Sequence, residues 1–259
     1  MLLNNIEDIA TYIVADGKGI LAADESNPTC GKRFDSIGVE STEENRRDYR
    51  EMLFRSKGMK DNIGGVILFD ETIRQTAADG TLLRDVISNQ GALPGIKVDK
   101  GLQPIEGCDG ETVTVGLEGL DERLKEYASM GAKFTKWRAV INIGDGIPSD
   151  KSIDANMKAL ADYAKCAQDN GMVPIVEPEV IMDGDHSIDE CYEASDRSLK
   201  SLFTHLEQNG VDIKGTLLKP NMITSGKESS EQAGINEVAK KTLDCLITVT
   251  YTHLTLPTT

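Results

Sequence analysis

The sequence predicts an α/β fold of the (β/α)8 barrel class, the TIM barrel, with about six of its eight βα units present. Short apolar segments recur at intervals of roughly 30 to 45 residues, which is too long for hairpins and suits parallel strands joined by helices. Stretches of helical periodicity separate these segments, and charged residues lie inside the later ones. The six predicted strands cover residues 19–24, 64–69, 95–99, 132–141, 172–180 and 215–220.

The stretches between the strands carry helix start and stop signals. A helix over 45–56 follows the Ser-x-x-Glu capping box that begins at Ser41. A second helix, over 121–130, ends at Gly131. Two further apolar stripes precede Asn-Gly pairs; they consist of Ile153, Met157, Leu160, Ala161 and Ala164, and of Leu199, Leu202, Phe203 and Leu206. Each helix has one apolar face, so these helices are expected to cover a sheet.

The polar residues distinguish an open doubly wound sheet from a closed barrel. An open dinucleotide-binding sheet would carry a Gly-x-Gly-x-x-Gly turn after its first strand, but Asp-Glu-Ser-Asn-Pro stands at 24–28. Side chains alternate between the faces of a strand, so three pairs of charged residues each share a face: Lys136 with Arg138, Glu177 with Glu179, and Lys97 with Asp99. The C-terminal mouth of a barrel brings such residues together, which favours the barrel.

Composition narrows the class of protein. A formal net charge of −15 disfavours binding to nucleic acid or to anionic membranes, so any phosphorylated ligand needs a local basic pocket. No apolar run reaches the ~20 residues of a membrane helix. The N-terminus lacks the features of a secretory signal, which predicts a cytosolic location. Five dispersed cysteines without a Cys-x-x-Cys pair predict reduced thiols.

Lys219 is the leading candidate for a nucleophile. It ends an apolar strand, precedes Pro220, and shares a face with Leu217, so a strand that buries Leu217 also buries the amine. An amine that is taken from water and placed near another cation loses its proton more readily. Lys136 and Arg138 are the candidate cations. The alternative is a structural lysine that pairs with a glutamate at the strand end.

Three carboxylates are candidates for proton transfer or charge balance. Glu177 and Glu179 share a strand face, and the repulsion between two carboxylates makes one of them a candidate acid or base. The alternative is that both neutralise Lys136 and Arg138. Asp24, at the end of the first strand, is either a functional carboxylate or the N-cap of the next helix.

Metal chemistry is not expected. The chain has three histidines, and only His186 falls in a loop that follows a predicted strand. A zinc site needs two or three convergent histidine or cysteine ligands, so the sequence predicts neither a metal nor another cofactor.

Six motifs resemble class I fructose-bisphosphate aldolases in identity, order and spacing. They are Leu-Ala-Ala-Asp-Glu-Ser at 21–26, Arg-Phe-Asp-Ser-Ile-Gly at 33–38 followed by Thr-Glu-Glu-Asn-Arg-Arg at 42–47, Gly-Ile-Lys-Val-Asp-Lys-Gly at 95–101, Lys-Trp-Arg at 136–138, Val-Glu-Pro-Glu at 176–179 and Leu-Leu-Lys-Pro-Asn-Met at 217–222. The likeness runs from the first helix to about Leu246. It implies a metal-independent lyase of glycolysis and gluconeogenesis that cleaves fructose 1,6-bisphosphate through a lysine imine. It also implies a sugar phosphate as the ligand and a homotetramer as the usual assembly.

The resemblance implies catalytic roles for five residues. Lys219 matches the lysine that forms the imine, and Lys136 the lysine that assists carbinolamine formation. Glu177 matches the general acid and base, and Glu179 the neighbour that keeps the lysine network charged correctly. Asp24 matches the carboxylate that orients the substrate and takes the proton from the hydroxyl at carbon 4.

Five further residues match substrate-binding positions. Ser26 and Lys97 fall where the family binds one phosphate, near the N-terminus of a helix whose free amides suit an anion. Thr29 replaces a phosphate-contacting serine and keeps the hydroxyl. Arg138 lies beside Lys136, and Arg33 completes the set.

The resemblance ends near residue 247, which divides the chain into a partial barrel over 1–247 and an atypical tail over 248–259. The tail is interpreted as non-native, or alternatively as a divergent seventh strand, because threonine alternates with other residues from Thr248 to Thr252. Two other functions remain open: a Schiff-base lyase with a different substrate, and an inactive truncated barrel fragment with a binding or scaffolding role.

Overall fold

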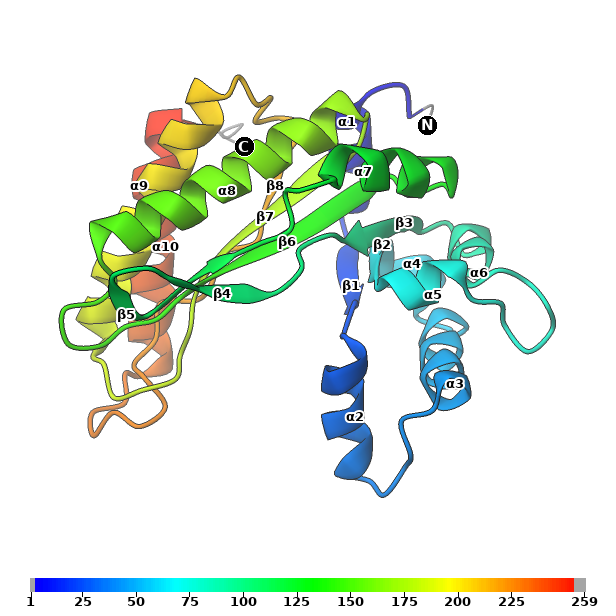
Figure 1. The fold of residues 1–259 in the computed structure, drawn as a ribbon, viewed down its shortest axis with the longest axis horizontal. Coiled ribbons are helices and arrows are strands. Elements are labelled where there is room, and N and C mark those ends of the chain that lie inside the picture. The colour runs from blue at the N-terminus through cyan, green and yellow to red at the C-terminus, as the bar shows by residue number, and fades with distance from the viewer. Residues whose placement is uncertain (1–2, 254–259) are drawn as a thin grey trace. The chain divides into compact units, whose positions relative to one another are not determined.

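The structure, a computed structural model, describes residues 3–253, with side chains up to residue 248 (Figure 1). The chain divides into two compact units whose segments alternate along the sequence. The first unit comprises Met1–Val98, Asp121–Lys136 and Ala167–Pro174, and the second comprises Asp99–Leu120, Trp137–Cys166 and Ile175–Thr259.

Six strands form one sheet in the order β1-β2-β3-β6-β7-β8. Their bounds are Gly19–Ala23 (β1), Ile63–Leu68 (β2), Leu93–Lys97 (β3), Phe134–Ile141 (β6), Val173–Val180 (β7) and Leu217–Leu218 (β8). The pairs β1–β2, β2–β3, β3–β6 and β7–β8 are parallel. All six predicted strands are confirmed, each to within two residues at either end.

The helices occupy the intervals between the strands. They are α1 (Ile6–Ile13), α2 (Asn27–Asp35), α3 (Glu43–Phe54), α4 (Met59–Asn62), α5 (Asp70–Arg74), α6 (Leu83–Asn89), α7 (Leu120–Ser129), α8 (Asp150–Asp169), α9 (Ile188–Gln208) and α10 (Ile235–His253). The helix expected over 45–56 is α3, but its N-cap is Thr42, whose side chain accepts a hydrogen bond from the amide of Asn45. Because α10 continues to His253, the alternative of a strand over 248–253 is wrong.

Within the first unit the strands curl around a face lined by large side chains. Phe134 of β6 lies against Gly95 of β3, where a Cβ atom would come within 2.4 Å of its ring. The next residue on the same face of β6 is Lys136, whose Nζ lies 3.3 Å from Asp24 Oδ2 at the end of β1. Because β2 and β3 separate β1 from β6, a flat sheet would hold these strands about 14 Å apart. The contact therefore requires a curled sheet.

Within the second unit the two faces of β6 differ in chemistry. Trp137 is fully buried and stacks on Tyr163 of α8, with 5.4 Å between ring centroids. Arg138 follows it and points to the opposite face, as strand alternation requires. The helix therefore covers one face with aromatic contacts and leaves the other face to charged residues.

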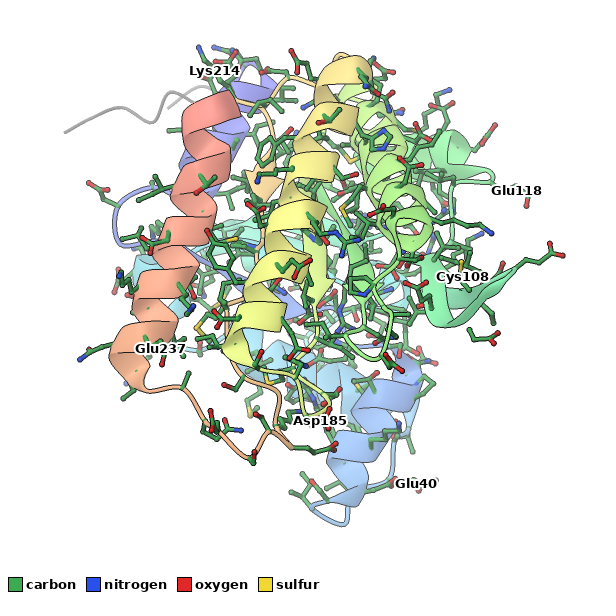
Figure 2. All side chains as sticks on the ribbon, turned by 90° about the vertical axis from the view of Figure 1, so that its left-hand side faces the viewer. Glu40, Cys108, Glu118, Asp185, Lys214 and Glu237 are labelled. Atoms are coloured by element: carbon green, nitrogen blue, oxygen red, sulfur yellow. The ribbon has the colours of Figure 1, made fainter. Side chains whose placement is uncertain are left out.

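Two features of the second unit were not predicted. Leu102–Ile105 (β4) and Cys108–Thr114 (β5) form an antiparallel pair. Helices α9 and α10 lie side by side in both views (Figures 1 and 2). Among residues 3–253, the structure contains no helix that is both long and apolar enough to cross a membrane.

Candidate functional site

The pair Lys219 and Glu177 lies at the end of β8. The parallel register places Val176 opposite Leu218, and the Lys219 amide donates to the Val176 carbonyl at 2.9 Å. This register brings the next residues, Glu177 and Lys219, side by side, and Lys219 Nζ donates to Glu177 Oε1. The Glu177 side chain is 3% exposed and the Lys219 side chain is 50% exposed. The expectation that the strand buries the lysine is therefore wrong, because β8 is only two residues long and the amine extends beyond it.

Arg138 and Glu179 form a second ion pair in the same unit. Arg138 Nε donates to Glu179 Oε2, and both side chains are partly exposed. The Thr114 hydroxyl donates to the Arg138 carbonyl at 2.8 Å and so ties β5 to β6. Glu179 thus balances Arg138, as one of the alternatives expected, whereas Glu177 pairs with the candidate nucleophile.

A cavity of about 380 Å³ lies beside these groups in the second unit. Arg138 and Glu179 line it, together with Pro220 and Asn221, the two residues that follow Lys219. Asn221 Oδ1 accepts a hydrogen bond from the Val180 amide at 3.2 Å, which fixes this segment against the end of β7. The segment that follows Lys219 therefore borders this cavity.

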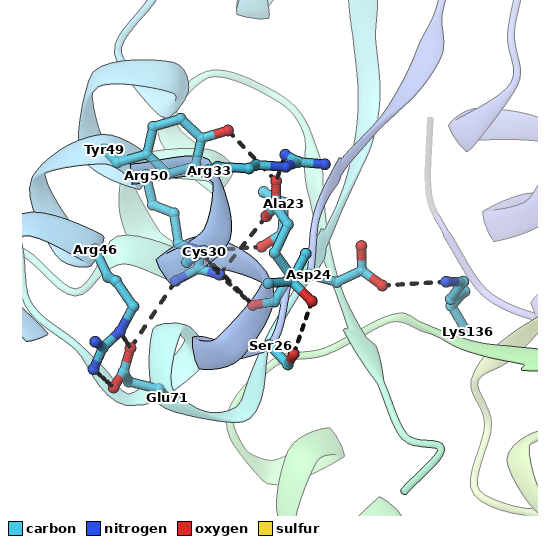
Figure 3. A network of polar contacts seen from close by, with 12 residues as sticks. Ala23, Asp24, Ser26, Cys30, Arg33, Arg46, Tyr49, Arg50, Glu71 and Lys136 are labelled. Atoms are coloured by element: carbon cyan, nitrogen blue, oxygen red, sulfur yellow. Dashed lines mark hydrogen bonds and ion pairs between the residues drawn. The ribbon is translucent and has the colours of Figure 1, made fainter. Parts of the chain in front are cut away.

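In the first unit, Asp24 and Lys136 pair at 3.3 Å, and their side chains are 12% and 9% exposed (Figure 3). The N-cap of α2 is Ser26, so the capping alternative for Asp24 is wrong. A carboxylate and an ammonium that are both largely withdrawn from water are stable only when their charges compensate each other, and this compensation holds the two side chains in one arrangement.

Two hydroxyl groups follow Asp24 closely in the sequence, and a second lysine lies beside Lys136 on the neighbouring strand. The hydroxyls of Ser26 and Thr29, at the start of α2, are 3.0 Å apart. Lys97 ends β3 and is the register partner of Lys136, so two ammonium-bearing residues occupy neighbouring strands. Arg33, near the end of α2, pairs with Glu25 and is mostly exposed. An anionic ligand such as a phosphate would suit these groups, which are two hydroxyls, a helix N-terminus and two lysines on neighbouring strands.

A buried network behind the β1–α2 link was missed by the sequence analysis. Arg46 and Arg50 of α3 are both buried, and Arg46 donates two hydrogen bonds to the Glu71 carboxylate, at 2.8 and 2.6 Å (Figure 3). The sequence signal was arginine at i and i+4 on one helix face, a pattern that usually marks solvated charge. Only the tertiary structure shows that this face is turned inward.

Glu71 is expected to make the stability of the protein depend on acidity. The hydrogen bonds from Arg46 hold the pKa of Glu71 below its usual range. A carboxyl with a lowered folded-state pKa contributes stability above its unfolded-state pKa and loses it as pH falls through the folded-state value. The Glu71→Gln variant should therefore lose about 1–3 kcal/mol of unfolding free energy at pH 7, and the difference from wild type should shrink below about pH 4.

Urea unfolding between pH 3 and pH 7 measures this difference. Glu118→Gln, at an exposed glutamate of the second unit, serves as the control. Equal responses of the two variants at all pH values would contradict the role of Glu71.

Among the residues that the structure describes, no group of three or more histidine, cysteine, aspartate or glutamate side chains is arranged to hold a metal ion. His186 is 5% exposed and lies in the loop between β7 and α9. Neither of its ring nitrogens has a hydrogen-bond partner within the described part of the chain.

Comparisons with known proteins agree on one family. Residues 5–254 match the family model described as glycolytic, fructose-bisphosphate aldolase class-I. A protein of Xanthomonas campestris pv. campestris named "Probable fructose-bisphosphate aldolase class 1" is 53% identical over 95% of this chain and 74% of its own length. "Fructose-bisphosphate aldolase 4, cytosolic" of Arabidopsis thaliana is 50% identical over 92% of this chain and 60% of its own length.

A solved structure gives the same result for the fold. Fructose-bisphosphate aldolase from Plasmodium falciparum, in complex with TRAP and a small-molecule inhibitor, superposes with a TM-score of 0.93. It is 45% identical, and the match covers 96% of this chain and 72% of that one. This agrees with the predicted α/β class of barrel type. The chain belongs to the class I fructose-bisphosphate aldolase family.

Proposed function

We propose that this protein catalyses the reversible cleavage of fructose 1,6-bisphosphate to dihydroxyacetone phosphate and glyceraldehyde 3-phosphate through an imine on Lys219. The observation that carries the proposal is the hydrogen bond from Lys219 Nζ to the buried carboxylate of Glu177. The residues that follow Lys219 in the chain, Pro220 and Asn221, line a small cavity. An amine becomes a nucleophile once an adjacent base accepts its proton, and Glu177 is positioned to be that base. Family membership supports the same reaction.

The reaction proceeds by transfers that these groups can perform. The free amine of Lys219 attacks carbon 2 of the ketone, and Glu177 returns a proton to the new hydroxyl, so that water leaves and an iminium forms. The bond between carbons 3 and 4 then breaks, and its electron pair moves toward the iminium nitrogen to give an enamine. The proton of the hydroxyl at carbon 4 leaves to a base, and the aldehyde product departs. Protonation at carbon 3 and hydrolysis release the second product and restore the lysine.

We assign the remaining residues to supporting roles. Asp24 accepts the proton of the carbon-4 hydroxyl, and Lys136, its partner at 3.3 Å, assists formation of the carbinolamine. Glu179 and Arg138 maintain the charge balance around the cavity. The remaining positions are assigned to the binding of substrate phosphate: Ser26, Thr29, Arg33 and Lys97.

Borohydride reduction in the presence of fructose 1,6-bisphosphate tests the proposal. Borohydride converts an imine to a stable secondary amine, so peptide mass spectrometry should locate a reduced adduct on Lys219. An adduct on a different lysine, or none although the protein binds the sugar phosphate, would overturn the mechanism. Turnover of a different ketose with the same adduct would favour the alternative of a Schiff-base lyase with another substrate.

The other proposals concern setting and assembly. Two relatives from Arabidopsis thaliana are named cytosolic, which supports a cytosolic location for this protein. We also propose that it works as a homo-oligomer without metal or organic cofactor. The division of the chain into a partial barrel and a separate tail over 248–259 stays a prediction. Helix α10 runs unbroken across residue 248, and the family match extends to residue 254.

A further inference from the structure

One buried side chain holds the link between β1 and α2. Arg50 lies on α3 and its side chain is fully buried (Figure 3). Its Nε donates to the carbonyl of Ala23 at 3.2 Å, and its Nη2 donates to the carbonyl of Glu25 at 2.6 Å. These carbonyls belong to the residues immediately before and after Asp24. A single guanidinium therefore fixes the backbone on both sides of the candidate catalytic carboxylate.

Two carboxylates keep the guanidinium in place. Its nitrogens lie 3.7 Å from Glu25 Oε2 and 4.0 Å from Glu71 Oε1. Glu71 is itself held by the two hydrogen bonds from Arg46, and it accepts a third from Asn27 of α2 at 3.3 Å. A buried cation is tolerated only with opposite charges and hydrogen-bond acceptors around it, and these groups supply both.

We propose that Arg50 is a positioning residue for Asp24 in the cleavage step, an inference that rests on the proposed function. Asp24 extends from the clamped segment toward Lys136, and the distance between their charged atoms is 3.3 Å. A displacement of about 1 Å in a group that transfers a proton can lower a rate by about 10²-fold. The planar fork of arginine presents donors on separate nitrogens to two carbonyls at once, whereas the three donors of a lysine ammonium all lie on one nitrogen.

The decisive variant is Arg50→Lys, which retains the charge and removes the fork. The expected result is a fall in kcat for fructose 1,6-bisphosphate cleavage of about 10- to 100-fold, with a much smaller change in KM. Imine trapping with dihydroxyacetone phosphate at Lys219 should persist, because this three-carbon ketone has no carbon-4 hydroxyl for Asp24 to deprotonate. A general loss of folding would lower both readouts together.

A double-mutant comparison separates positioning from structure. If Arg50 acts through Asp24, adding Arg50→Lys to Asp24→Asn should lower kcat no further than Asp24→Asn alone. Arg46→Lys is the matched control, because Arg46 is buried on the same helix and holds Glu71 but donates to neither carbonyl beside Asp24. It should reduce thermal stability and lower kcat much less than Arg50→Lys does, because Arg46 reaches Arg50 only through Glu71, which lies 4.0 Å from the Arg50 guanidinium.

Amide hydrogen exchange gives a readout that does not depend on turnover. The segment 24–27 should exchange faster in Arg50→Lys than in Arg46→Lys. If Arg50→Lys unfolds, Arg50→Gln replaces it, because glutamine keeps one donor nitrogen without the fork, and the same faster exchange is expected. The inference would be overturned by any of three results. The exchange of segment 24–27 could stay unchanged in Arg50→Lys, the kcat losses of Arg50→Lys and Asp24→Asn could multiply in the double variant, or Arg46→Lys could lose as much kcat as Arg50→Lys. A wild-type protein that neither cleaves nor is trapped would instead overturn the proposed function, and the exchange comparison would still decide whether Arg50 holds the segment.

Discussion

The Lys219→Met variant is expected to lose cleavage of fructose 1,6-bisphosphate, with a fall in kcat of at least about 10⁴-fold. Methionine is similar in length to lysine but has no amine, so the carbonyl carbon has no nucleophile and no imine can form. Because half of the Lys219 side chain is already exposed, methionine fits without a steric conflict. A coupled assay that follows dihydroxyacetone phosphate, together with borohydride trapping, measures both losses.

The control for this variant is Lys200→Met. Lys200 is an exposed lysine of α9 that pairs with Asp196 one helical turn away, so its replacement should leave both turnover and trapping intact. Thermal unfolding of each variant shows whether the fold persists. Residual turnover in Lys219→Met above a tenth of wild type would mean that another group forms the intermediate, and the assignment of the nucleophile would fail.

The strands were predictable because the signal that defines them is local. Each of the six combines an apolar run with glycine, proline or charge at its ends, and each is confirmed within two residues. The β4–β5 pair was missed for the same reason. Its second strand, Cys-Asp-Gly-Glu-Thr-Val-Thr at 108–114, is mostly polar and has no clear alternation. It is held by contacts with distant residues, such as the amide of Thr114 with Asn156, which a local pattern does not contain.

The residues of the candidate site were also identified, but their pairing was not. Strand alternation shows which side chains share a face, as with Glu177 and Glu179, yet it does not say which strand lies next to which. The partner of Glu177 depends on the register of β7 with β8, and the partner of Asp24 depends on the curl of four strands. Arg50 was missed entirely, because its function depends on two backbone carbonyls that have no signature in the sequence.

The exposure of Lys219 also changes the account of how the amine is activated. The strand was expected to bury the Lys219 amine, but half of the side chain is exposed. Under the proposed mechanism the proton acceptor is Glu177, whose carboxylate accepts a hydrogen bond from the amine.

The Glu177→Gln variant tests that account, and it is expected to lower kcat by about 10²- to 10⁴-fold. Glutamine has nearly the same shape and still accepts a hydrogen bond from Lys219, but it can neither take the proton of the amine nor return one to the departing hydroxyl. Borohydride reduces the imine and not the carbinolamine, so the rate of adduct formation should fall along with turnover. Glu207→Gln, at an exposed position of α9, is the matched control and should leave both rates unchanged. If turnover fell while adduct formation kept its wild-type rate, Glu177 would act only after the imine has formed, and a different group would have to remove the proton from Lys219.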